Sequence, residues 1–342
     1  MDAAQLLPVV KKLYQQAEEA AEAYNATELR LTGQRAETAR LSTQLTAARS
    51  ALKRSRDDAG QLARRQYQGS SGLSAYLQVL LSPSPQQALD QARLVERAAG
   101  SQAAVITRLG RSEARADRLA VLSRQALERQ RALREKHRGQ RDAVQARLRE
   151  VEALLAALSA RDLARLASLE QAGTASAQRE LIKSGALGGT QLPSHAGSMA
   201  LQYAARQIGK PYVWGAEGPE SFDCSGLTSQ AWAHAGRFIP RTSQEQWARL
   251  PKVPLRSLRP GDLVIYFPGA THVAVYAGQG LVVHAPRPGS RVKVSPIASN
   301  PLLGAVRPDP AAPALGRYTP PHLPRSAGAG PDTGYSAQAP PS

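Results

Sequence analysis

Apolar and small residues recur at alternating steps of four and three along the first half of the chain. The clearest seam positions near the N-terminus are Leu41, Leu45, Ala48, Leu52, Ser55, Ala59 and Leu62. This spacing places the side chains on one face of an α-helix, which is typical of a coiled coil. The pattern predicts one long helix over residues 3–67.

The helical pattern stops in residues 68–85, where glycine, serine and proline cluster, and it resumes over residues 86–171. The seam of this second helix contains Val144, Leu148, Val151, Leu155 and Leu158. Two long helices joined by a break fold most simply into an antiparallel coiled-coil hairpin. The alternative is two helices that continue apart within an oligomeric rod.

The composition divides the chain into four parts. Residues 1–171 form the helical domain, for which we expect a regulatory or localising role. Residues 172–197 are rich in Gly, Ser, Ala and Thr, which predicts a flexible linker. Residues 309–342 form a Pro/Ala/Gly-rich tail without apolar periodicity, which predicts disorder. Residues 198–308 lie between them and form a folded domain.

Helical and strand patterns both occur in residues 198–308. Helices are expected over 198–208 and from 224 to Gly236, a glycine placed where it can end a helix. The expected strands are residues 262–267, 272–277, 281–286 and 291–297. Helices followed by strands predict an α+β domain with an antiparallel sheet.

The positions of the aromatic residues and the net charge narrow the location of the core and the range of possible partners. All Trp and Phe residues lie between positions 214 and 267, so the globular core is expected there. The formal net charge is +17, and basic residues exceed acidic ones in both halves. No nucleic-acid-binding signature accompanies this excess, so we expect no nucleic-acid partner. The excess of basic residues is consistent with a simple bias in composition, or with attraction to a polyanionic surface such as a cell wall. No apolar run is long enough to predict a membrane span.

Cys224 is the single cysteine of the chain. One thiol cannot form an intramolecular disulfide, and it is too few for a cysteine-based zinc site. Avoidance of cysteine elsewhere suits an oxidising compartment. The first residues, MDAAQLLPVVKKLYQQ, lack the basic and apolar regions of a signal peptide, so these residues leave secretion open.

Cys224 stands immediately before a predicted helix. The positive end of the helix dipole and its free N–H groups lower the pKa of a thiol, which favours the nucleophilic thiolate. A lone cysteine is more often a small buried hydrophobe. Here the polar neighbours Asp223 and Ser225 argue against an apolar pocket, so Cys224 is the candidate nucleophile.

His272 and His284 are the candidate partners of the thiol, because the other four histidines lie in the long helix, the linker, the tail or too far along the helix after Cys224. A turn at residues 277–279 would place the two imidazoles directly opposite each other on one side of the sheet. This predicts a Cys–His–third-group arrangement. A metal site is the rival interpretation, although no clear third ligand is present.

Six segments occur in the order and spacing of a known family. They are GKPYVWG (209–215), FDCSGL (222–227), IPRTSQEQ (239–246), LRPGDLVIY (258–266), HVAVYAG (272–278) and VVHAP (282–286). They resemble the NlpC/p60-type cell-wall cysteine peptidases, which have a papain-like fold. The resemblance implies an NlpC-type catalytic domain preceded by the antiparallel coiled coil. It also implies that Cys224 is the nucleophile, His272 the base and His284 the group that orients His272.

The resemblance implies further site residues. Tyr212 would support the thiolate or the oxyanion, together with the backbone N–H groups at the start of the Cys224 helix. Asp223, Ser225 and Arg241 are candidate substrate contacts. No metal or cofactor is expected.

The family implies a secreted or wall-associated peptidoglycan endopeptidase acting in wall remodelling or cell separation. It typically cuts stem peptides between γ-D-glutamate and the diamino acid. Expected partners are peptidoglycan and, for the coiled coil, a membrane complex or the catalytic domain itself. One alternative is an amidase or acyltransferase on the same Cys–His scaffold. Another is a non-enzymatic coiled-coil scaffold with a degenerate hydrolase domain, against which the intact Cys224, His272 and His284 argue.

Overall fold

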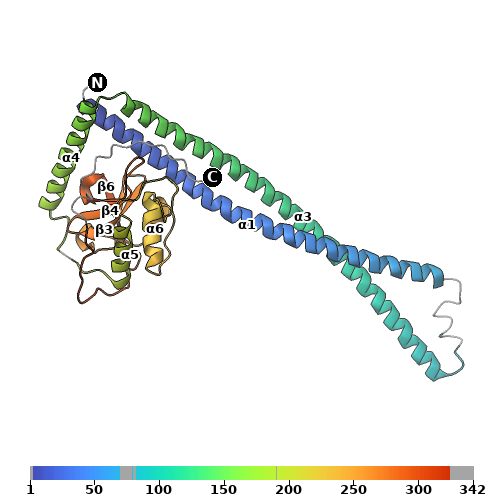
Figure 1. Cartoon of the computed structure of the whole chain (residues 1–342). Helices are drawn as coiled ribbons and strands as arrows, with labels where there is room; N and C mark the ends of the chain where they lie inside the picture. The colour runs from blue at the N-terminus through green and yellow to red at the C-terminus, as the bar shows by residue number, and fades with distance from the viewer. Residues whose placement is uncertain (1–2, 70–78, 80–81, 190, 324–342) are drawn as a thin grey trace. The chain divides into compact units, whose positions relative to one another are not determined.

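The computed structural model describes residues 3–69, 79, 82–189 and 191–323 (Figure 1). The chain divides into two compact units. Unit 1 comprises Met1–Leu29 and Lys136–Ser342, and unit 2 comprises Arg30–Glu135. The first turns of the N-terminal helix therefore belong to the same unit as the C-terminal domain, whereas the sequence places the boundary at residue 171.

Three long helices precede the sheet: α1 (Ala3–Gly69), α3 (Pro85–Ala156) and α4 (Ala160–Lys183). Within unit 2, α1 and α3 run antiparallel, because Arg56 bonds to Glu113 and Gln66 to Gln102. Within unit 1 they continue antiparallel, and His137 of α3 lies 2.6 Å from Glu28 of α1. The predicted antiparallel helical hairpin is confirmed.

The prediction of one helix over residues 86–171 is wrong, because the chain breaks between α3 and α4. Ser159 has extended backbone angles, and its hydroxyl accepts the N–H of Asp162 at 3.2 Å. Serine at this position satisfies a free donor at the helix start, which favours a new helix over continuation of the seam.

Helix α4 continues to Lys183, so the part of the expected linker up to that residue is helical. Its sequence, TASAQRELIK, is rich in residues of high helix propensity. Gln178 also binds the domain, because its amide donates to the carbonyl of Gly280 at 3.0 Å and accepts the N–H of Ala298 at 3.1 Å. Local propensity and these contacts together order a segment whose composition resembles a linker.

Small side chains fill the seam between the helices of unit 2. Ala48 and Ala126 are buried there, and the hydroxyls of Ser55 and Ser112 lie 3.2 Å apart. Such a seam buries little apolar area for each turn of helix.

A six-stranded antiparallel sheet forms the centre of unit 1. Its strands are β1 (Lys252–Val253), β2 (Leu263–Tyr266), β3 (His272–Gly278), β4 (Leu281–His284), β5 (Lys293–Pro296) and β6 (Leu302–Val306). Their order is β1-β6-β2-β3-β4-β5. The four expected strands are β2 to β5, and the α+β class is confirmed. The sequence analysis missed β1 and β6, which are paired at residues Val253 and Ala305.

The hairpin of β3 and β4 has a different register from the predicted one. Val275 pairs with Val283, whereas a turn at residues 277–279 would pair Val275 with Leu281. The turn lies instead at Gln279 and Gly280, whose φ angles are 54° and 72°. A two-residue hairpin turn with positive φ at both positions matches the twist of the two strands, and Gly280 adopts such a φ angle without strain. Because the shift is two residues, His272 and His284 remain on one face of the sheet.

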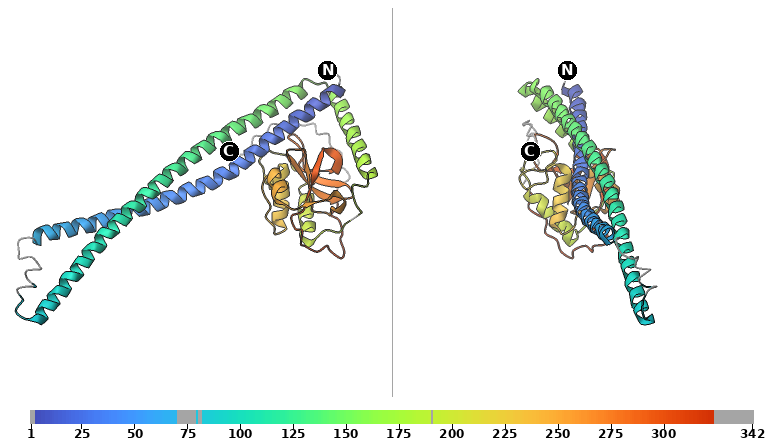
Figure 2. Two further views of the ribbon diagram at one scale, coloured as in Figure 1. Left: turned by 180° about the vertical axis from the view of Figure 1, so that it is seen from behind. Right: turned by 90° about the vertical axis from the view of Figure 1, so that its right-hand side faces the viewer.

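Three helices complete the domain: α5 (His195–Arg206), α6 (Cys224–His234) and α7 (Ser243–Arg249). Two 3-10 turns, η1 (Leu255–Ser257) and η2 (Ile297–Ser299), lie between the strands. Helices α5 and α6 pack against each other and against β3 and β4 (Figure 2). The buried side chains between them include Leu201, Leu227 and Trp232. Helix α7 was not expected from the sequence.

The first part of the expected disordered tail is ordered. Asp309 is buried, and its carboxylate accepts a bond from Arg259 at 2.7 Å. The N–H of Leu315 donates to the carbonyl of Pro193 at 2.8 Å. The prediction of disorder is therefore wrong for this segment, because one buried carboxylate binds it to the domain. Residues 324–342 lie outside the described residues.

Candidate active site

Cys224 is the first residue of α6, as the sequence predicts. Asp223 caps the helix, because its carboxylate accepts the N–H of Gly226 at 2.6 Å. A Cβ atom on Gly226 would lie 2.2 Å from the carbonyl oxygen of Ala216, so only glycine fits at this position. The backbone N–H of Val273 at the start of β3 acts to lower the pKa of the Cys224 thiol, although other causes outweigh it.

His272, His284 and Ser295 form a chain of hydrogen bonds across the sheet. Nε2 of His272 lies 2.8 Å from Nδ1 of His284, and Nε2 of His284 lies 2.9 Å from the Ser295 hydroxyl. If each Nε2 carries the proton, His272 donates to His284 and His284 donates to Ser295. Nδ1 of His272 is then unprotonated and free to act as a base. Ser295 was missed from the sequence, because only the β4–β5 register reveals its position.

Tyr212 is buried in the same apolar cluster as Cys224. Burial raises the pKa of its hydroxyl well above the ordinary value, and the nearby Cys224 and Asp223 act in the same direction. The phenol is therefore neutral and retains its proton for donation.

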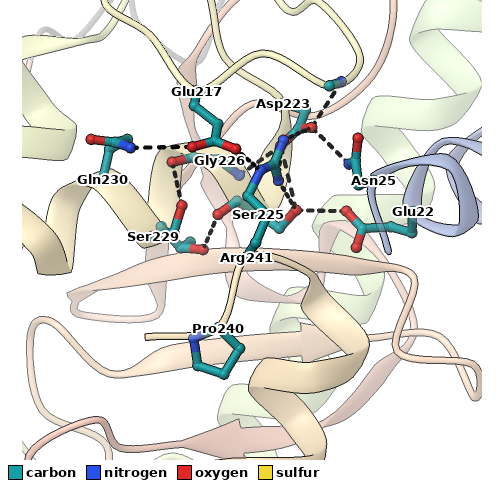
Figure 3. Close-up of polar contacts among 12 residues, drawn as sticks. Glu22, Asn25, Glu217, Asp223, Ser225, Gly226, Ser229, Gln230, Pro240 and Arg241 are labelled. Carbon is teal, nitrogen blue, oxygen red and sulfur yellow. Dashed lines mark hydrogen bonds and ion pairs between the residues drawn. The ribbon is translucent and has the colours of Figure 1, made fainter. Parts of the chain in front are cut away.

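The three candidate substrate contacts form one network (Figure 3). The Arg241 guanidinium donates to the Asp223 carboxylate at 2.7 and 3.1 Å and to the Ser225 hydroxyl at 2.8 Å. Glu217 is a second ion-pair partner of Arg241. Asp223 also accepts the N–H of Gly215 at 2.9 Å. These contacts hold the start of α6 in place through side chains from three segments.

Three polar residues of α1 reach the same site, and the sequence analysis missed them. The Glu22 carboxylate accepts the Ser225 hydroxyl at 2.6 Å and the N–H of Ser243 at 2.9 Å, and it lies 3.8 Å from the Cys224 sulfur. Glu18 lies 3.5 Å from Nδ1 of His272. Asn25 donates to Asp223 at 3.0 Å (Figure 3). The sequence carried one signal of this: the three residues are four and three positions apart, which places them on one face of the helix.

The thiol environment differs from the sequence prediction. The start of a helix lowers the pKa of a thiol, but here burial raises the pKa of Cys224 well above its ordinary value. The carboxylates of Glu22, Asp223 and Glu18 raise it further. The expectation of a lowered pKa is therefore wrong for this arrangement, in which the thiol stays protonated.

Burial also keeps both imidazoles neutral. It lowers the pKa of His272 to about 3, although Asp223 partly opposes the shift. It lowers the pKa of His284 well below the ordinary value, and the neighbouring His272 acts in the same direction. A neutral imidazole can accept the proton of a thiol, so the state seen here precedes any thiolate–imidazolium pair.

Among the described residues, no group of three or more His, Cys, Asp or Glu side chains is arranged to hold a metal ion. The described helices also include none that is long and apolar enough to cross a membrane.

A thiol at a helix start, a pair of hydrogen-bonded imidazoles and a buried phenol form a set of groups suited to nucleophilic acyl transfer. Residues 209–304 match the NlpC/P60 family. A probable endopeptidase of Corynebacterium glutamicum strain R is 40% identical over 141 residues, which cover 41% of this chain and 67% of that protein. The chain belongs to the NlpC/P60 family.

Two other similar proteins each match about a third of this chain. A probable endopeptidase from another C. glutamicum strain is 45% identical over 116 residues, covering 34% of this chain and 56% of that protein. The solved NlpC/p60 domain of the peptidoglycan hydrolase SagA has 34% identity and a TM-score of 0.31. That match covers 32% of this chain and 97% of the SagA chain.

Proposed function

We propose that this protein is a peptidoglycan hydrolase, a cysteine endopeptidase that cuts the stem peptides of bacterial cell wall. The main support is the hydrogen-bonded series from Ser295 through His284 to His272, together with the position of Cys224 at the start of α6. Relatives named as probable endopeptidases support the reaction class. The bond we propose joins γ-D-glutamate to the diamino acid.

The first half of the reaction forms a thioester. Nδ1 of His272 takes the proton of the Cys224 thiol, and the sulfur attacks the carbonyl carbon of the scissile bond. The N–H groups at the start of α6 and the Tyr212 hydroxyl stabilise the oxyanion. The C–N bond then breaks, and the leaving amine takes its proton from His272.

The second half releases the new carboxyl group. His272 removes a proton from water, the resulting hydroxide attacks the thioester, and the C–S bond breaks. The sulfur then recovers the proton, which restores the thiol. His284 keeps the His272 ring in place through both halves, and Ser295 in turn fixes His284.

The remaining residues and regions have proposed roles too. Asp223, Ser225 and Arg241 contact the substrate. Residues 1–171 regulate or localise the enzyme. The site of action is outside the cell or at the wall, where the basic net charge of +17 would favour an anionic surface.

The test is the substitution Cys224→Ala. We expect it to abolish the release of peptide fragments from purified sacculi, because no other thiol exists in the chain. Mass spectrometry of the digest identifies the newly freed amino group and hence the bond. Fragments produced at the wild-type rate by Cys224→Ala would refute the cysteine mechanism. A freed amine at another position would change the assigned bond or reaction.

A further inference from the structure

A groove lies between α1 and α3 within unit 2, with a volume of about 650 Å³. Along α3 the residues that line it run from Ala103 to Arg115. At 1.5 Å of rise per residue, this stretch of helix is about 18 Å long. The groove is therefore elongated, which suits a linear ligand better than a compact one.

The polar side chains of the groove supply positive charge and hydrogen-bond donors. They are three guanidinium groups and two hydroxyls, from Arg108, Arg111, Arg115, Thr107 and Ser112. Among the described residues that line the groove, none carries a carboxylate. Asp58 is not part of the lining and lies 3.8 Å from Arg108, and both side chains are largely exposed, so this pair is weak. The lining therefore presents an excess of positive charge to a ligand.

The three arginines form a row along the helix. They are three and four positions apart, which places them on one face of α3. Their Cα atoms follow one another at steps of roughly 4.5–6 Å along the helix axis. A chain with one negative charge in each repeat can therefore contact more than one of them at once, which strengthens binding without any single strong contact.

We propose that this groove binds a linear phosphate polymer of the cell wall, and that Arg108, Arg111 and Arg115 pair with its phosphodiester groups. The inference rests on the proposed function for the source of the polymer, since the wall is where the enzyme would act. Binding there would hold the protein close to the stem peptides that it cuts.

The chemistry of the lining favours phosphate. A guanidinium group donates two parallel hydrogen bonds to the two free oxygens of a phosphodiester. The hydroxyls of Thr107 and Ser112 can donate to the same kind of oxygen. A phosphate polymer would therefore find a donor at each step along the groove.

The other lining residues argue against a protein partner. All five are alanines: Ala47, Ala48, Ala51, Ala103 and Ala104. Alanine buries little apolar area, so a partner helix would gain little from packing there. A second copy of this unit would be repelled, because basic residues outnumber acidic ones by about two to one in residues 30–135. Charge must supply most of the affinity.

The experiment measures binding of fluorescently labelled poly(glycerol phosphate) to the full chain by anisotropy. One variant replaces Arg108, Arg111 and Arg115 with Gln. Its matched control replaces three other exposed arginines of α3 with Gln, namely Arg124, Arg131 and Arg134, none of which lines the groove. Both variants lose the same charge, and glutamine has a helix propensity close to that of arginine. We expect the Kd to rise about tenfold in the groove variant, the sum of three exposed ion pairs, and less than about twofold in the control.

Equal weakening in the two variants would show that net charge alone attracts the polymer and would overturn the site. Two unlabelled competitors test the class of ligand. Poly-L-glutamate carries carboxylates, and phosphatidylglycerol vesicles carry phosphate on a surface. We expect unlabelled poly(glycerol phosphate) to displace the probe best at equal charge. Displacement as good by either competitor would overturn the assignment to a phosphate polymer.

Hydrolysis of a purified muropeptide is measured on the same samples. The polymer contains no peptide bond, so its binding does not depend on Cys224. We expect the groove variant to cleave the muropeptide at the wild-type rate. Binding without cleavage by any of the proteins would refute the proposed hydrolysis and leave the groove in place. Cleavage by a wild type that does not bind the polymer would refute the groove alone.

Discussion

At the scale of single residues, the site contains a hydrogen-bonded series of three side chains: His272, His284 and Ser295. We call it a graded series because their proposed roles differ in importance. In the proposed reaction His272 transfers the proton. Nδ1 of His284 bonds to Nε2 of His272, and Ser295 bonds to His284. A group that transfers the proton has no substitute, whereas a group that orients its neighbour can be replaced in part. The effect of substitution should therefore fall with distance from Cys224.

We expect His272→Ala to lose about 10²–10⁴-fold in kcat/KM, the usual contribution of a general acid–base. His284→Gln should keep measurable activity, because an amide can still accept the bond from His272. Ser295→Ala should lose only about fivefold, the value of one hydrogen bond. Ser299→Ala, elsewhere in the same domain, is the control. Equal losses at all three positions would contradict the graded series.

At the scale of elements, the start of α6 is fixed by close approach as well as by its cap. Gly226→Ala would place a methyl group 2.2 Å from the Ala216 carbonyl, so backbone must move. We expect a loss of about 1–3 kcal/mol in the free energy of unfolding, which overpacking commonly causes. Gly173→Ala in α4 meets nothing within 4 Å and is the matched control. Thermal unfolding of both variants measures the difference, and equal midpoints would contradict the prediction.

The sequence predicted the elements that carry the motifs and missed those that depend on remote pairing. Helix α6 and strands β2 to β5 follow from turn residues and apolar patterns. Strand β1 has only two residues and exists because β6 pairs with it, which no local pattern reveals. Cys224, His272 and His284 were found from motif residues, whereas Ser295 and Glu22 reach the site through sheet register and helix packing.

At the scale of the whole molecule, the first turns of α1 are part of the unit that contains the site. The sequence placed them in a separate helical domain, since heptads indicate helix pairing and carry no information about a third surface. Tyr24 packs edge-on against Trp214 with ring centroids 4.7 Å apart. Arg287 lies over the Tyr14 ring and bonds to Glu170 of α4. Side chains of α1 and α4 therefore pack against the C-terminal domain within this unit.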